Sequence, residues 1–159
     1  MAYNNTNLSL RRVITSLNWG VQVEYDMNPI PNGVTNVFNV VGGRVLLIDL
    51  QGIVTTQLQA AALTLEWDHI ADIGANPPLS VASADLTGTA VGMMMLMPAT
   101  AAGAMTVSAA GGYLKLFPEI GWVLNTGSIA LDSSAARTGG IKWTAYYIPL
   151  DDGAYLEAA

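Results

Sequence analysis

Short apolar runs with a period of two recur along the chain, and no stretch keeps a 3.6-residue apolar period between helix caps. The clearest run, residues 141–148, predicts a strand that Pro149 ends. One face of this strand would carry Ile141, Trp143, Ala145 and Tyr147. The other face would carry Lys142, Thr144 and Tyr146. A turn at Asp151-Asp152-Gly153 and a short tail follow.

Further strands are expected at spacings of about 8–12 residues, separated by turn residues. They are residues 34–41, 44–49, 53–58, 61–67, 79–85, 91–97, 113–117, 121–124 and 128–131. The run 44–49 is almost wholly apolar, which predicts a strand buried on both faces, and Gly52 predicts a bulge or bend after it. Asn76-Pro77-Pro78 predicts a loop, because neither proline can donate a ladder hydrogen bond.

This pattern predicts an all-β fold, a single-domain β-sandwich that is jelly-roll-like or β-barrel-like, built from short antiparallel strands. One segment fits two interpretations. Residues 57–65 are rich in alanine and fit a short helix, whereas the preceding Thr55-Thr56 favours a strand. We expect one domain over residues 21–159, preceded by an N-terminal arm over residues 1–20 that reaches a neighbouring subunit.

Composition favours a subunit of an assembly. Hydrophobic residues make up 52% of the 159 residues and charged residues only 11%, against about 25% in a typical soluble protein. A disordered chain has the opposite balance, so this one folds. Because it has little charge with which to cover a monomer, we expect partner subunits to cover part of its apolar surface.

The charge pattern does not favour a nucleic-acid partner. The formal net charge is −6, and the six basic residues are dispersed, with Arg11-Arg12 as the only adjacent pair. A membrane partner is not expected either. Residues 86–114 carry no charge, but their glycines and hydroxyls predict two short strands joined by an Ala/Gly loop. The absence of cysteine removes disulfides, thiol nucleophiles and Cys-ligated zinc.

Candidate catalytic groups are few. His69 is the only histidine, and a hydrolase would need it beside Asp68 or Asp72, with a serine nucleophile. No Gly-x-Ser-x-Gly motif exists, so we interpret His69 as an ordinary surface residue at a strand end. The clustered carboxylates, including Asp151-Asp152, fit turns better than a glycosidase pair. We therefore expect no enzyme activity, metal, cofactor or small-molecule substrate.

The run Met93-Met94-Met95-Leu96-Met97 is the most unusual stretch. It fits either a central strand buried on both faces or a methionine-rich contact surface, made by Met94 and Leu96 or by the three odd-numbered methionines. Aromatic residues are scattered through the predicted strands, where they would anchor a core or an interface. The residues expected at a subunit interface are Tyr3, Arg11, Arg12, Trp19, Met93, Met95, Met97 and Tyr146.

Two segments resemble the small virion structural proteins of tailed bacteriophages, the kind that decorate or cement a capsid. They are residues 39–56, NVVGGRVLLIDLQGIVTT, and residues 139–155, GGIKWTAYYIPLDDGAY. The more specific part is the ending, an aromatic strand that runs into Pro-Leu-Asp-Asp-Gly-Ala-Tyr. The resemblance implies a β-rich subunit that clips onto the capsid lattice, often as a trimer at a junction between capsomers.

The function expected from composition and resemblance together is that of a capsid decoration or cement protein. Its partners would be further copies of itself, with a trimer favoured, and the major capsid protein. It would lie at the capsid surface of the virion, after assembly in the host cytoplasm. A tail, neck or baseplate component is the alternative within the same class. A carbohydrate-binding β-module, which uses exposed aromatics, is the alternative from another class.

Overall fold

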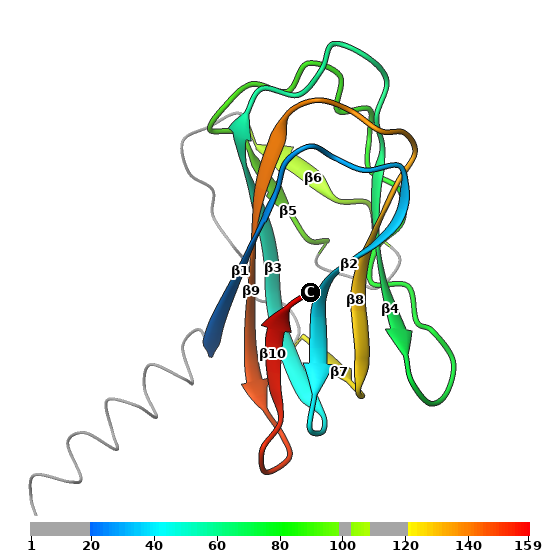
Figure 1. The fold of residues 1–159 in the computed structure, drawn as a ribbon, viewed down its shortest axis with the longest axis vertical. Coiled ribbons are helices and arrows are strands. Elements are labelled where there is room, and N and C mark those ends of the chain that lie inside the picture. Colours follow the sequence, from blue (N-terminus) through cyan, green and yellow to red (C-terminus); the bar gives the residue numbers. More distant parts are fainter. Residues whose placement is uncertain (1–19, 99–102, 109–120) are drawn as a thin grey trace, which may run out of the picture.

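The computed structural model describes residues 20–98, 103–108 and 121–159. In these residues the chain forms strands and no helix, and the strands make two antiparallel sheets packed face to face (Figure 1). The strands are β1 (Val21–Met27), β2 (Gly33–Val41), β3 (Val45–Thr56), β4 (Leu65–Ala71), β5 (Met94–Leu96), β6 (Thr106–Ser108), β7 (Trp122–Leu124), β8 (Gly127–Ser133), β9 (Gly140–Pro149) and β10 (Tyr155–Ala158). The all-β prediction is confirmed, and the fold is a β-sandwich rather than a closed barrel.

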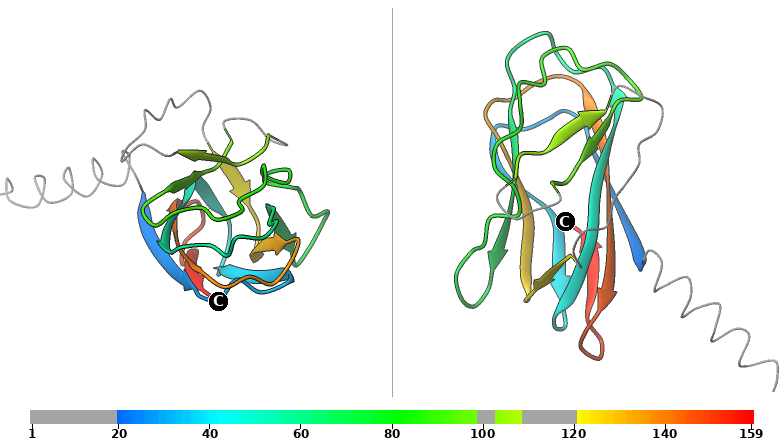
Figure 2. Two further views of the ribbon diagram at one scale, coloured as in Figure 1. Left: turned by 90° about the horizontal axis from the view of Figure 1, so that it is seen from above. Right: turned by 180° about the vertical axis from the view of Figure 1, so that it is seen from behind.

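The six-stranded sheet has the order β1-β9-β3-β5-β6, and β7 pairs with the first residues of β3. The four-stranded sheet has the order β10-β2-β8-β4. Viewed from above and from behind, loops cross the upper end of the sandwich between the two sheets (Figure 2). Backbone hydrogen bonds join these loops, as between Ile30 and Arg137, 3.0 Å in both directions.

The predicted alternation along β9 is confirmed. Its inward side chains, Ile141, Trp143, Ala145 and Tyr147, are buried in the core. Across the sandwich, Trp67 of β4 packs against Trp143 with ring centroids 4.8 Å apart and the rings nearly perpendicular. Edge-to-face pairing of this kind adds about 0.5–1.5 kcal/mol to the burial of the two rings.

Gly52 has a different role from the predicted bulge. It stays in register, opposite Trp143 of β9 and Met95 of β5, and the register shifts of β3 lie on either side of it, near Ile48 and Thr55. A Cβ at position 52 would lie 2.5 Å from the Trp143 ring. Glycine is therefore required there because the indole fills the space that a side chain would need.

Burial along β3 also differs from the prediction. Val45 and Leu47 are buried, whereas Leu46 and Ile48 are only partly buried. The strand therefore has one core face and one outer face, and the prediction of burial on both faces for residues 44–49 is wrong. The helix considered at 57–65 is absent, and the strand predicted at 61–67 begins only at Leu65.

The strand predicted at 79–85 is also wrong, although this segment runs beside β4. The backbone nitrogens of Leu79 and Ser80 donate to the Trp67 carbonyl, and the Ser80 hydroxyl accepts from the Trp67 nitrogen. Serine hydroxyls thus accept hydrogen bonds from backbone nitrogens of β4 in place of the carbonyls of a neighbouring strand. The backbone groups at this edge of the sheet are therefore paired although no regular strand lies beside β4. Residues 76–78 form the predicted loop.

The uncharged stretch contains two short paired strands: β5 lies within the strand predicted at 91–97, whereas β6 lies in a segment for which no strand was predicted. In the part of the chain that the structure describes, no helix is long and apolar enough to cross a bilayer. The predicted strand at 113–117 lies outside the described residues. After the predicted turn at 151–153, the short tail forms a strand, β10, which pairs with β2.

Candidate interaction surfaces

The outer face of the six-stranded sheet combines apolar side chains on β3, β5 and β7 with polar and charged ones, which include the Glu24–Lys142 ion pair between β1 and β9. Strand alternation turns one set of side chains into the core and the next set outward. The outward apolar residues are Leu46 and Ile53 of β3, Met94 and Leu96 of β5, Val123 of β7 and Ile148 of β9. Val123 is 60% exposed and Ile53 is 39% exposed. We call these six residues the apolar outer face.

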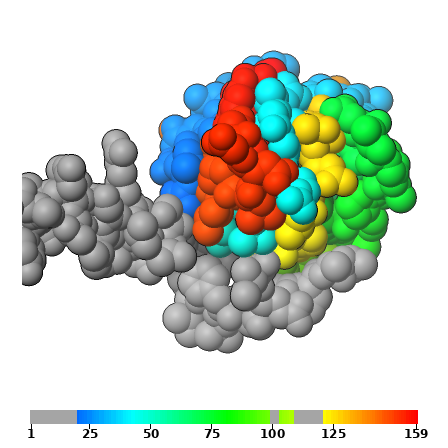
Figure 3. Space-filling view, turned by 90° about the horizontal axis from the view of Figure 1, so that it is seen from below, coloured from blue at the N-terminus to red at the C-terminus, as the bar shows by residue number. Residues whose placement is uncertain are grey.

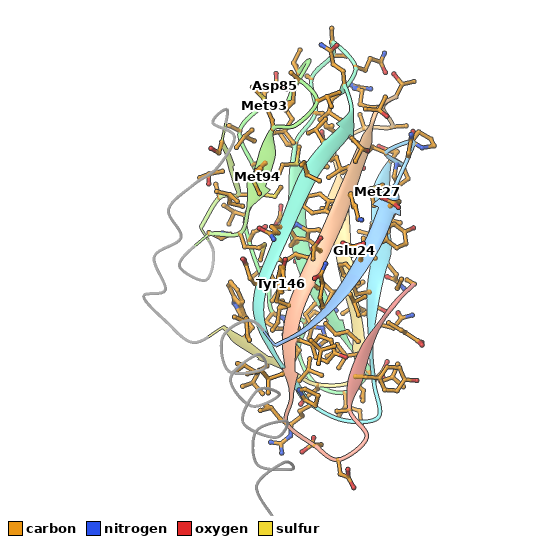
Figure 4. All side chains as sticks on the ribbon, turned by 90° about the vertical axis from the view of Figure 1, so that its left-hand side faces the viewer. Glu24, Met27, Asp85, Met93, Met94 and Tyr146 are labelled. Carbon is orange, nitrogen blue, oxygen red and sulfur yellow. The ribbon has the colours of Figure 1, made fainter. Side chains whose placement is uncertain are left out.

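Polar groups lie in the middle of this face. The Gln51 amide nitrogen donates to the Tyr146 hydroxyl over 3.0 Å, and an Asp49 carboxylate oxygen accepts from the Leu50 nitrogen over 2.8 Å. Figure 4 looks onto the sheet and shows Tyr146 on β9, Glu24 on β1 and Met94 on β5. Tyr146, expected at an interface from sequence, is partly buried and belongs to this face.

The methionine run divides between the core and the apolar outer face. Met95 and Met97 are buried in the core, and Met93 is partly buried against it. Because these side chains face inward, the prediction that Met95 and Met97 contact a neighbouring subunit does not fit the folded protomer. Met94 and Leu96, the other pair considered, are partly buried on the outer side. Three residues of the run form β5, which lies between β3 and β6, and only one of its faces is buried.

Acidic residues gather on the outer face of the four-stranded sheet. Glu66 of β4 lies directly opposite Asp132 of β8, and Asp68 follows on the same side of β4. Burial raises the pKa of Glu66, and the charges of Asp68 and Asp132 raise it further. Burial and the charge of Asp132 likewise raise the pKa of Asp68. Among the described residues, no group of three acidic or histidine side chains is placed to hold a metal ion.

His69 is not the surface residue that the sequence suggested. It lies within β4 and is 2% exposed, because alternation in this strand turns Leu65, Trp67 and His69 into the core. Burial lowers the pKa of His69, and the charge of Asp72 offsets part of that effect. Asp68 points to the opposite face of the strand, so the described residues do not bring His69 and Asp68 together for catalysis.

Asp151 holds two turns together at one end of the sandwich. Its carboxylate accepts from the Arg44 backbone nitrogen at 2.7 Å and forms an ion pair with the Arg44 guanidinium at 2.7 Å. These bonds lower the pKa of Asp151 to about 2. The aspartate therefore acts in a turn, as the sequence suggested, and links the β2–β3 turn to the β9–β10 turn.

Half of the eight aromatic residues that the structure describes are buried. Trp67, Trp143 and Tyr147 are buried, whereas Tyr155 of β10 is 42% exposed. Figure 3 shows β10, β2, β8 and β4 side by side when the sandwich is seen from below. A carbohydrate platform needs several exposed rings on one face, and the described residues do not supply one there.

The remaining expected interface residues, Tyr3, Arg11, Arg12 and Trp19, lie outside the described residues. Sequence reasoning missed Leu46, Ile53, Val123 and Ile148 as surface residues, because an apolar side chain in a strand is usually assigned to the core. The available signal was the continuous apolar run in β3, where alternate residues must face outward. Comparison with models of protein families, with curated proteins and with solved structures finds no match to this chain.

Proposed function

We propose that the protein is a structural subunit of a tailed-bacteriophage virion and acts as a capsid decoration or cement protein. The observation that carries the proposal is the apolar outer face of the six-stranded sheet, with Val123 60% exposed on it. An exposed apolar surface of this kind favours a partner protein, because burying it against one releases ordered water.

The two segments that resemble virion proteins support the proposal. In the fold, residues 39–56 and 139–155 contain β3 and β9, which pair along most of their length. Arg44 and Asp151 join the turns that belong to the same two segments. The resemblance thus falls on one contiguous unit, and that unit carries Leu46, Ile53 and Ile148 of the apolar outer face.

A cement subunit of this kind stabilises a shell by mass action. It binds adjacent capsid subunits in their assembled state and not when they are apart, so binding shifts the equilibrium toward the shell. No chemical step is needed. Further copies of the chain and the major capsid protein are the partners in this proposal.

A matched pair of substitutions tests which face binds. Val123→Asp places a charge on the apolar outer face, and Val34→Asp places one at a similar exposure, 57%, on the four-stranded sheet. We expect Val123→Asp to abolish co-sedimentation with shells that lack the protein and Val34→Asp to retain it. Circular dichroism checks that both variants fold. Equal binding by both variants would refute the assignment of this face.

The alternative, a tail, neck or baseplate component, would use the same surface. It differs from the leading proposal only in where the chain lies in the virion. Mass spectrometry of separated heads and tails places the chain in the head fraction if it is a decoration protein. Recovery in the tail fraction alone would replace the leading proposal with the alternative.

A further inference from the structure

β1 is the last strand on one side of the six-stranded sheet. It pairs with β9 from Val21 to Met27, and among the described residues no strand lies along its other edge. Figure 4 looks onto this sheet and shows Glu24 on β1. The free edge of a strand presents a row of backbone donors and acceptors with which a strand of another chain can pair.

Three inward side chains of β1 are less covered than those of its neighbour β9. Val21 is 44% exposed, and Val23 and Tyr25 are only partly buried although they pack against the core. On β9, by contrast, the inward side chains from Ile141 to Tyr147 are all buried. A strand added at the free edge would cover the inner side of β1 if it carried apolar residues there.

The outward side chains of β1 restrict what such a strand can carry. Gln22, Glu24 and Asp26 are exposed on this side. Glu24 forms an ion pair with Lys142 of β9, and the Gln22 amide nitrogen donates to the Glu24 carboxylate over 2.9 Å. Because like charges directly opposite each other destabilise a strand pair, a carboxylate opposite Glu24 or Asp26 is disfavoured.

A second copy of β1 meets both requirements in one register. If two β1 strands lie antiparallel with Val23 opposite Val23, then Val21 lies opposite Tyr25, and Gln22 lies opposite Glu24. β-Branched and aromatic side chains then meet on the inner side, and an amide meets a carboxylate on the outer side, both of which are favourable pairs. Asp26 lies opposite Gly20, which has no side chain.

The neighbouring registers are less favourable. A pair centred on Glu24 places two carboxylates directly opposite each other, and a pair centred on Tyr25 places Glu24 opposite Asp26. A pair centred on Gln22 contains only residues 20–24 of the described chain, whereas the pair centred on Val23 contains residues 20–26. The charges and the length of the pair therefore favour the register centred on Val23.

We propose that two copies of this chain pair through the free edges of β1, with Val23 opposite Val23, and continue the six-stranded sheet from one protomer into the other. The contact has two-fold symmetry, because both copies use the same residues. It gives a dimer, whereas the resemblance to virion proteins implies a trimer. The pairing is inferred from the edge and its side chains and does not depend on the virion assignment.

The pairing has a consequence for the apolar outer face. Directly opposite residues of an antiparallel pair point to the same side of the sheet, so the outer faces of the two copies lie on one side of the continuous sheet. A dimer can therefore present two apolar outer faces to one partner surface, which raises its affinity over that of a single copy. This consequence, unlike the pairing itself, rests on the proposed function.

Sedimentation equilibrium of the full chain over a wide range of concentration measures the dimer dissociation constant. Gln22→Glu places a carboxylate opposite Glu24 at two points of each dimer, and we expect it to raise this constant about tenfold. The control, Asn36→Asp, adds the same charge at an exposed position of β2 in the other sheet and should leave the constant unchanged. Circular dichroism checks that the variants fold.

A second substitution tests the register itself. Adding Glu24→Gln to Gln22→Glu again places a carboxylate opposite an amide and returns the net charge to its natural value, so the double variant should dimerise more tightly than Gln22→Glu alone. Weakening by Gln22→Glu and recovery in the double variant support the proposal. A natural chain that stays monomeric at the highest concentration, a dimer that Gln22→Glu does not weaken, or a double variant that does not recover would overturn it.

Discussion

At the residue scale, the roles of His69 and Gly52 depend on what the fold packs against them. His69 is a core residue of β4, and Gly52 makes room for the Trp143 ring. Neither role is visible from local sequence, because each depends on what the opposite strand or sheet places against the residue.

Acid should destabilise the protein through His69. Its pKa is lowered on folding from the ordinary value of 6.5, so the unfolded chain binds a proton more readily than the folded one. The free energy of unfolding is therefore highest above about pH 6.5 and falls as the pH drops below that value. Urea titrations from pH 8 to pH 5 measure the fall. His69→Leu should be less sensitive to pH over this range, and an identical dependence in both proteins would rule out His69 as the cause.

Adding a methyl group at position 52 should destabilise the fold. Gly52→Ala forces the Trp143 ring or the β3 backbone to move, which costs about 1–3 kcal/mol, as overpacking of a core does. Chemical unfolding followed by tryptophan fluorescence measures the loss. The matched control is Ile53→Ala, one residue further along β3 on the outer face, which should cost about 0.5 kcal/mol. If the two variants lost equal stability, the packing argument for Gly52 would be wrong.

At the element scale, the sequence predicts strands well where one face is buried and the turns are marked. β2, β8 and β9 lie within a residue or two of their predicted bounds, because alternation and glycine turns agree there. Residues 57–65 and 79–85 could not be assigned correctly. Their backbone groups bond to loops and serine hydroxyls of distant segments, and such partners leave no local pattern.

Truncation should test the N-terminal arm that we expect from the sequence. If this arm reaches a neighbouring subunit, removing residues 1–10 should abolish shell binding and leave the free energy of unfolding unchanged. Co-sedimentation and thermal unfolding measure the two effects. Unchanged binding after this deletion would exclude the arm.

At the scale of the whole molecule, the low content of charged residues and the apolar residues on the outer face are the two features that support the proposed role as a subunit of an assembly. The fold class followed from strand spacing, but the surface could not be predicted in the same way. The methionine run drew attention to Met95 and Met97, which are in the core, whereas Ile53 of β3 and Val123 of β7 are exposed. Choosing between the two faces of a strand requires knowing which face the second sheet covers, and that is a property of the tertiary fold.

The most direct test of the proposal that this chain decorates a capsid is a cryo-EM reconstruction of the virion in which the proposal places it. We predict density for the two-sheet sandwich at symmetry-related sites on the outer shell, with Val123 and Ile53 turned toward the major capsid protein. A complete map of head and tail in which no density fits the sandwich would contradict the account.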